Sequence, residues 1–232
     1  MQRYLFIPAA VWLLSGCDAD DITLVTTPQP VTINTDFNDG EQGWSAGFSD
    51  YPVADADIYE LESGIADLPD DSGQQGFRLK GMNRSDDLFM YLKGEVIRLS
   101  PNTNYTVHGS ITFLSNAGVD CIGIGGSPGE SVYMKLGASE IEPEQVDFYL
   151  NIDKGQQSQS GNDAIVIGNV AAQDASCDGN TFGSKTITVA LEDGFEIQSS
   201  TEGTFWLMVG TDSGYEGLTD LYYTEINLTL TP

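Results

Sequence analysis

Hydrophobic and polar residues alternate in short runs from Val31 to the end of the chain. This period of two is typical of β-strands that bury one face. Clusters of Gly, Asn, Asp and Ser separate the runs, and no long segment has a helical period. The pattern predicts a single all-β domain, an antiparallel β-sandwich or jelly roll, whose last strand is the natural partner of its first. The runs lie at 76–82, 88–92, 105–113, 131–139, 146–152, 185–192, 203–210 and 222–230.

The same alternation places three aromatic residues, Trp206, Tyr133 and Tyr149, on the polar side of their strands. Because an aromatic ring can cover the apolar C–H face of a sugar, these residues are candidate ligand-binding residues. The alternative is that loops or neighbouring strands cover their rings. Trp44 is expected in the core, and the single histidine, His108, is expected on the surface.

Residues 1–16 have the pattern of an export signal rather than of a folded domain. An arginine precedes the apolar run 4–14, which is shorter than the roughly 20 residues that span a bilayer as a helix. The Leu-Ser-Gly-Cys sequence that ends at Cys17 resembles the lipobox of bacterial lipoproteins. This resemblance implies acyl chains on Cys17 and a lipid anchor in the inner or outer membrane of a bacterial cell envelope. A flexible tether would then extend to residue 30, and the domain would occupy 31–232; the alternative is an ordinary signal peptide.

The chain is strongly acidic, with 35 Asp and Glu against 9 Lys and Arg and a formal charge of −26. One of the basic residues lies in the export signal, so the mature chain carries 8 − 35 = −27. A field of this sign repels nucleic acid and anionic membrane surfaces. We therefore expect no nucleic-acid partner, and the charge favours solubility and cations.

Two cysteines remain after the predicted cleavage, Cys121 and Cys177. An even number of cysteines in an exported protein predicts a disulfide. The bond would close a loop of roughly 57 residues and stabilise the fold by about 4 kcal/mol. A zinc site is disfavoured because neither cysteine has a neighbouring histidine.

Three segments together resemble galactose-binding-like jelly-roll domains, a group that includes many bacterial carbohydrate-binding modules. Residues 36–44 are similar to the opening of these domains, residues 99–107 to the Pro-Asn turn that leads into a central strand, and residues 221–226 to the closing strand. The resemblance implies a two-sheet sandwich, carbohydrate binding and a frequent structural Ca²⁺ near the opening loop and the last strand. The implied calcium ligands are Asn38, Asp39 and Glu225, and the alternative is a plain Asp-Gly turn.

Two polar loops, 83–87 and 212–216, lie where loops of a sandwich gather at one end and form a site. Solvated turns are the alternative explanation. The candidate ligand-binding residues in these loops are Asn83, Arg84, Asp86, Asp87, Asp212 and Tyr215.

No set of catalytic residues emerges from the sequence. Residues 125–129 match G-x-S-x-G, but Pro128 lacks the backbone N–H that an oxyanion hole needs at that position. The leading hypothesis is a non-catalytic, lipid-anchored envelope module that binds a glycan or another extracellular ligand. The alternatives are a structural or adhesive lipoprotein with a protein partner and an enzyme on extracellular polymers, which needs two close carboxylates in a cleft.

Overall fold

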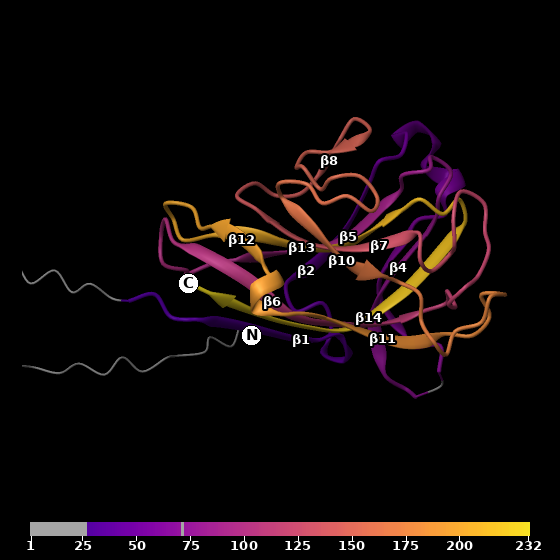
Figure 1. The fold of residues 1–232 in the computed structure, drawn as a ribbon, viewed down its shortest axis with the longest axis horizontal. Helices are drawn as coiled ribbons and strands as arrows, with labels where there is room; N and C mark the ends of the chain where they lie inside the picture. Colours follow the sequence, from indigo (N-terminus) through magenta and orange to yellow (C-terminus); the bar gives the residue numbers. More distant parts are fainter. Residues whose placement is uncertain (1–26, 71) are drawn as a thin grey trace, which may run out of the picture.

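The computed structural model describes residues 27–70 and 72–232, which form one β-sandwich (Figure 1). The predicted lipobox and Cys17 lie outside the described residues. The helices in the described part are three short 3₁₀ turns, and none of them is long and apolar enough to cross a membrane. They are η1 (Phe37–Asp39), η2 (Val53–Tyr59) and η3 (Leu191–Asp193).

The first layer is a seven-stranded antiparallel sheet built around β14, with the order β11-β6-β14-β4-β3. Strand β12 also pairs with β6, and β1 pairs with β14 from Val31 opposite Leu230 to Asp36 opposite Glu225. This pairing confirms that the last strand is the partner of the first. The strands are β1 (Val31–Asp36), β3 (Glu62–Asp67), β4 (Gln75–Met82), β6 (Asn104–Ser115), β11 (Gly183–Val189), β12 (Phe195–Gln198) and β14 (Leu218–Thr231).

The second layer is a five-stranded antiparallel sheet with the order β10-β7-β13-β5-β2. The main core lies between the two layers, because the apolar side of each alternating strand faces the other sheet. Trp44 belongs to this core, as predicted, and its indole N–H donates to Thr35 Oγ1 at 3.0 Å. The strands are β2 (Trp44–Ser49), β5 (Phe89–Val96), β7 (Val132–Ser139), β10 (Ala164–Asn169) and β13 (Phe205–Ser213).

The predicted strand at 146–152 is wrong. Its residues belong instead to a small hairpin, β8 (Gln145–Val146) and β9 (Tyr149–Leu150), and Asp147 takes a left-handed φ of 57° in the turn. The apolar alternation has a different origin, since Leu150 and Ile152 pack against the outer face of the five-stranded sheet while Val146 is exposed.

The segment 140–163, which we call the cover segment, lies over that outer face, and its hairpin stands above the sheet in Figure 1. Under it, Leu150 and Ile152 form a second apolar cluster with Phe89, Tyr91 and Met208. The outer face of this sheet is therefore not a free surface. A long connection between β7 and β10 buries part of it.

The predicted disulfide is confirmed. Cys121 lies in the β6–β7 connection and Cys177 in the β10–β11 connection, with 5.4 Å between their Cα atoms. Both connections cross from one sheet to the other, so the bond holds two crossovers together at one end of the sandwich.

Candidate ligand-binding site

A group of buried charges lies where the cover segment meets the five-stranded sheet. Lys135 comes from β7 and Asp212 from β13, on the outward-facing side of each strand. Asp50 directly follows β2, Asp87 precedes β5, and Lys154 is contributed by the cover segment. We call these five residues the charge cluster.

The charge cluster lies at the end of the sandwich remote from the C-terminus and from the start of β1. Asp212 is close in sequence to the start of β14, whereas the C-terminus and the start of β1 lie at the far end of that strand (Figure 1). The end that carries the cluster therefore points away from the segment preceding Val31.

Asp212 is the centre of the charge cluster, and its side chain is fully buried. Its Oδ2 lies 3.0 Å from Lys135 Nζ and 2.8 Å from Lys154 Nζ, and it accepts the backbone N–H of Gln157 at 2.9 Å. A carboxylate at the centre of two buried ammonium groups is held by charge-assisted hydrogen bonds, which are stronger than neutral ones. These contacts fasten the cover segment to the sheet.

The two lysines have further partners. Lys135 Nζ donates to the carbonyl oxygens of Lys154 at 2.7 Å and Gln159 at 3.0 Å, and both of these carbonyls belong to the cover segment. Lys154 Nζ lies 3.6 Å from Asp50 Oδ2 and 5.1 Å from the centroid of the Phe89 ring. Each ammonium is thus surrounded by acceptors, which offset the cost of burying its charge.

Burial and mutual charge move the pKa values of this group in different directions. Burial lowers the pKa of Lys135 despite the attraction of Asp212. Burial alone would also lower the pKa of Lys154, but Asp212 and Asp50 together outweigh it and raise that pKa above its ordinary value. Burial raises the pKa of Asp87 to about 7, and the neighbouring Asp212 and Asp50 add to this increase against the opposing charge of Lys154.

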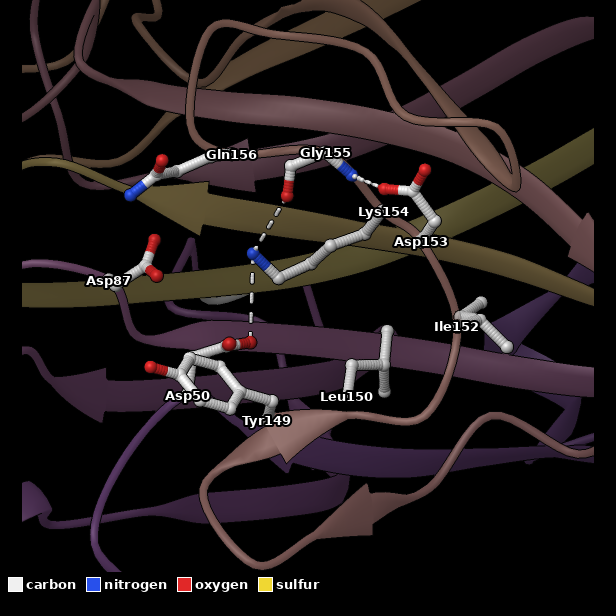
Figure 2. Close-up of a pocket in the computed structure, with 9 residues that line it drawn as sticks. All are labelled: Asp50, Asp87, Tyr149, Leu150, Ile152, Asp153, Lys154, Gly155 and Gln156. Carbon is white, nitrogen blue, oxygen red and sulfur yellow. Dashed lines mark hydrogen bonds and ion pairs between the residues drawn. The ribbon is translucent and has the colours of Figure 1, made fainter.

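A pocket of about 320 Å³ opens beside the charge cluster, between the cover segment and the loops that carry Asp50 and Asp87 (Figure 2). The exposed ring of Tyr149 stands at one wall, next to Asp50 in this view. Lys154 extends across the pocket to Asp50. The remaining lining residues are Leu150, Ile152, Asp153, Gly155 and Gln156.

The structure brings together several of the predicted ligand-binding residues. Tyr149 and Asp87 line the pocket, and Asp212 lies directly behind it in the charge cluster. Asp212 is a correction, because the sequence placed it in a polar loop whereas it is a fully buried residue of β13. Strand β13 continues past Gly210 because the buried ammonium of Lys135 balances the charge of the Asp212 carboxylate.

Trp206 and Tyr133 lie on the same outer face as the charge cluster but do not line the pocket. Both are half-buried. Lys93 Nζ lies 5.8 Å from the centroid of the Trp206 ring and 2.7 Å from Glu142 of the cover segment. Neighbouring groups thus cover part of the Trp206 ring, which was the alternative considered for these aromatic residues.

The other predicted loop residues have different surroundings. Asn83 is buried and organises its loop, because its amide donates to the carbonyl oxygens of Ser213 and Tyr215. Tyr215 lines a separate pocket beside the disulfide. The Asp86 carbonyl accepts a hydrogen bond from Gln157 of the cover segment, while Arg84 is exposed and does not line the pocket.

The calcium ligands that the resemblance implies are only partly brought together. Asn38 and Glu225 line a hollow of about 280 Å³ that also includes Asp36 and Thr224, and Asp39 is not among its lining residues. Asp36 stands opposite Glu225 in the strand register. Among the described residues, no three His, Cys, Asp or Glu side chains are grouped so as to hold a metal ion. The calcium site stays a prediction.

Sequence reasoning missed Lys135, Lys154 and Asp50. The alternation did place Lys135 on the polar side of its strand, together with Tyr133. Nothing in the pattern indicates that the segment 140–163 folds back over that side. The one available signal is a pair of opposite charges. Lys135 lies on the polar side of its strand, and the neighbouring strand carries the Asp212 carboxylate on the same side.

No protein-family model and no curated protein sequence matches this chain. Solved β-sandwich domains do resemble it. A structure of carbohydrate-binding modules from the β-sandwich superfamily is 10% identical, covers 82% of this chain and has a TM-score of 0.39; this chain spans 58% of that protein's length. The CBM22-1 xylan-binding domain of Paenibacillus barcinonensis Xyn10C is 9% identical over 89% of this chain and 98% of that domain, also with a TM-score of 0.39.

The K1 cleaved adhesin domain of Lys-gingipain from Porphyromonas gingivalis W83 is 12% identical over 87% of this chain and 98% of that domain, with a TM-score of 0.36. These identities and scores are too low to carry an argument about function. The class of protein rests on the strand pairing itself, which defines an all-β, single-domain sandwich of two antiparallel sheets.

Proposed function

We propose that this protein is a non-catalytic binding module that takes a glycan in the pocket beneath the cover segment. The observation that supports the proposal most is that one pocket is lined both by an exposed aromatic ring, that of Tyr149, and by several carboxylates. Tyr149 is 65% exposed at the pocket, although Leu150, the next residue of the same strand, packs onto the sheet. A large, exposed aromatic residue beside fixed polar groups is the usual composition of a site for a partly apolar, hydroxyl-rich ligand.

The polar wall suits sugar hydroxyls. Asp87, Asp50 and Asp153 line the pocket and provide hydrogen-bond acceptors, while the side-chain amide of Gln156 provides donors. The volume of about 320 Å³ is at the low end of the range for small-molecule pockets, roughly 300–1,000 Å³. The pocket therefore fits one unit of a longer chain or a small oligosaccharide, not a large apolar molecule.

The position of the pocket also fits the predicted anchor. If Cys17 carries acyl chains, residues 18–30 connect the membrane to β1, and the pocket lies at the far end of β14 from that attachment. The binding end would then face away from the membrane. Anchoring is testable by itself, since Cys17→Ser should release the protein from membranes and leave the domain folded.

A glycan array followed by titration calorimetry tests the binding proposal. Tyr149→Ala should lower the affinity for the selected glycan about tenfold, which is 1.4 kcal/mol, because it removes the stacking surface. The matched control is Val146→Ala, which truncates another exposed residue of the same hairpin and should leave affinity unchanged. Absence of binding to every glycan by folded protein would contradict the proposal. Release of new reducing ends from a bound polysaccharide would contradict its non-catalytic part.

A second candidate function, contact with a protein partner, is favoured by one observation. The loop beside the disulfide exposes 98% of Ile122 and 71% of Ile124 to solvent. Neighbouring exposed aliphatic residues on a loop are typical of protein contact surfaces. A stoichiometric partner that is recovered from envelope extracts with the wild type, and lost with the double variant Ile122→Ser and Ile124→Ser, would favour this function.

A further inference from the structure

Lys135 and Asp212 form a fully buried ion pair between neighbouring strands. They lie on neighbouring strands, β7 and β13, in diagonal positions, because Gly210 is the register partner of Lys135 and Asp212 that of Tyr133. Both side chains are completely inaccessible to solvent, and Lys135 Nζ lies 3.0 Å from Asp212 Oδ2. Because Oδ2 is bonded to Cγ, the nitrogen lies one bond away from the carbon that an amine attacks.

Asp87 completes the group. Within the part of the chain that the structure describes, two buried carboxylate oxygens have no hydrogen-bond partner in this region, Asp87 Oδ1 and Asp212 Oδ1. A buried, unsatisfied carboxylate oxygen is costly, and two adjacent carboxylates relieve the cost when they share one proton. The neighbouring charge of Asp212 adds to burial in raising the pKa of Asp87, in line with such sharing.

From this juxtaposition we infer that Lys135 and Asp212 condense spontaneously to a covalent isopeptide bond between strands β7 and β13, with Asp87 as the proton carrier. This bond is a modification of the domain itself and is independent of glycan binding.

The reaction needs no other reagent. Lys135 first gives one proton to the carboxyl pair and becomes a neutral amine, and Asp212 becomes a neutral carboxylic acid with its proton on Oδ1. The amine lone pair attacks Asp212 Cγ, and the new C–N bond forms as the C=O π electrons move to Oδ2. The nitrogen then loses its second proton to Asp87, which acts in its carboxylate form and delivers the proton to Oδ1. The C=O bond re-forms from the electrons on Oδ2 as the C–Oδ1 bond breaks, and one water molecule leaves. Asp87 ends in its initial protonation state.

The surroundings match each stage of this reaction. Oδ2, where negative charge develops, already accepts hydrogen bonds from Lys154 Nζ and from the Gln157 N–H. Donors fixed in advance at such an oxygen act as an oxyanion hole. Burial favours the neutral, nucleophilic form of Lys135. Lys154 remains a cation because Asp50 also holds it, so the cluster keeps a counter-charge after Lys135 has been consumed.

Two physical factors move the equilibrium toward the amide. The amine and the acid are held by two paired strands, so the condensation has the high effective molarity of an intramolecular reaction. Both groups are shielded from solvent, so the expelled water does not readily return to hydrolyse the product. A static ammonium with three acceptors is the competing state of Lys135, and it predicts no covalent bond.

Tryptic mapping of the reduced protein separates the two states. Beyond Arg98 the only cleavage residues are Lys135, Lys154 and Lys185, so an unlinked chain yields separate peptides 99–135, 136–154 and 186–232. The linked chain cannot be cut at Lys135. It should yield one branched species in which 99–154 is joined to 186–232, lighter by one water than the sum of its parts. The branch also distinguishes the bond from water loss at an Asp-Gly step.

Three variants sharpen the test. Lys135→Met should abolish the branched species. Asp87→Asn should lower the linked fraction at least tenfold, whereas the matched control Asp86→Asn, the exposed neighbour on the same loop, should leave it unchanged. Wild-type protein that yields only the separate peptides would overturn the inference. Complete linkage in Asp87→Asn would overturn the role of Asp87. Because the wild-type map decides the main question, failure of a variant to fold does not obscure it.

Discussion

The two outer faces of the sandwich both carry ion pairs between neighbouring strands, but in opposite environments. On the seven-stranded sheet, Arg78 pairs with Asp220 at 2.7 Å and with Glu62 at 2.9 Å, and Lys80 pairs with Glu62 at 2.6 Å. The side chain of Glu62 is 50% exposed, so water screens its contacts with Arg78 and Lys80, whereas Asp220 is buried.

On the five-stranded sheet, the Lys135–Asp212–Lys154 group is sealed beneath the cover segment. Similar distances thus have different consequences. The exposed ion pairs of Glu62 can be replaced at little cost to stability. The buried group must stay complete, because a member that loses its partner is an uncompensated buried charge. The difference indicates that the cover segment, rather than the ion-pair chemistry, creates the candidate site.

Removal of the central carboxylate on each face is the strongest test of this contrast. Asp212→Ala leaves Lys135 buried without its counter-charge and removes one of the two carboxylates that hold Lys154, so it should lower the free energy of unfolding by about 3–5 kcal/mol. Glu62→Ala breaks two pairs but should cost only about 0–1 kcal/mol. Urea denaturation of both variants measures the difference. Equal losses would mean that burial does not distinguish the two faces.

The predicted calcium site lies on the other sheet, the seven-stranded one, where Asp36 and Glu225 are opposite each other in the strand register. If an ion binds only the native state there, it stabilises the domain by about 2.7 kcal/mol at a hundredfold excess over its dissociation constant. The melting temperature should then rise by about 5–10 °C, and magnesium should substitute poorly because it requires a smaller octahedral site. Glu225→Gln should remove the response. A melting temperature that chelator does not change would contradict the predicted site.

Trp206 tests how far the binding surface extends across the five-stranded sheet. It shares the face with the pocket but does not line it, and Lys93 lies 5.8 Å from the centroid of its ring. Trp206→Ala should therefore change glycan affinity by less than about twofold, against about tenfold for Tyr149→Ala. A larger loss at Trp206 would move the site from the pocket to the open part of the sheet.

The pH dependence of stability provides the smallest expected effect. Because the folded-state pKa of Asp87 lies near 7, above its unfolded value, the native protein binds more protons between about pH 4 and pH 7. Stability should consequently fall as the pH rises through this window. Burial is the main cause of the shift, so the trend persists whether or not Asp212 is linked. Asp87→Asn should flatten the profile, which is measured by thermal melts from pH 4 to 8, while Asp86→Asn should not.

Period-two alternation predicted the architecture because inward-facing residues of both sheets form one core. Ile111 and Phe113 of β6, for example, pack in the same cluster as Leu207 and Val209 of β13. The alternation failed at 146–152, because two residues that pack onto an outer face mimic a strand that packs into the core.

The same alternation does not predict the charge cluster. Lys135 has the sequence environment of a surface residue, and its burial depends on a segment that begins at residue 140 and returns over the sheet. Local alternation contains no information about such long-range coverage. Tyr149 was predicted from its place on the polar side of an alternating run and Asp87 from its place in a polar loop, without the pocket that joins them.

The central claim is that the pocket under the cover segment binds a glycan, and chemical-shift mapping tests it most directly. A glycan selected from the array is titrated into ¹⁵N-labelled protein, and the amide signals of both sheets are followed. We expect the largest changes at Asp87, Tyr149 and residues 153–156, and none along the outer face of β6. Changes concentrated on the seven-stranded sheet or at the disulfide loop, with the pocket amides unaltered, would contradict the claim.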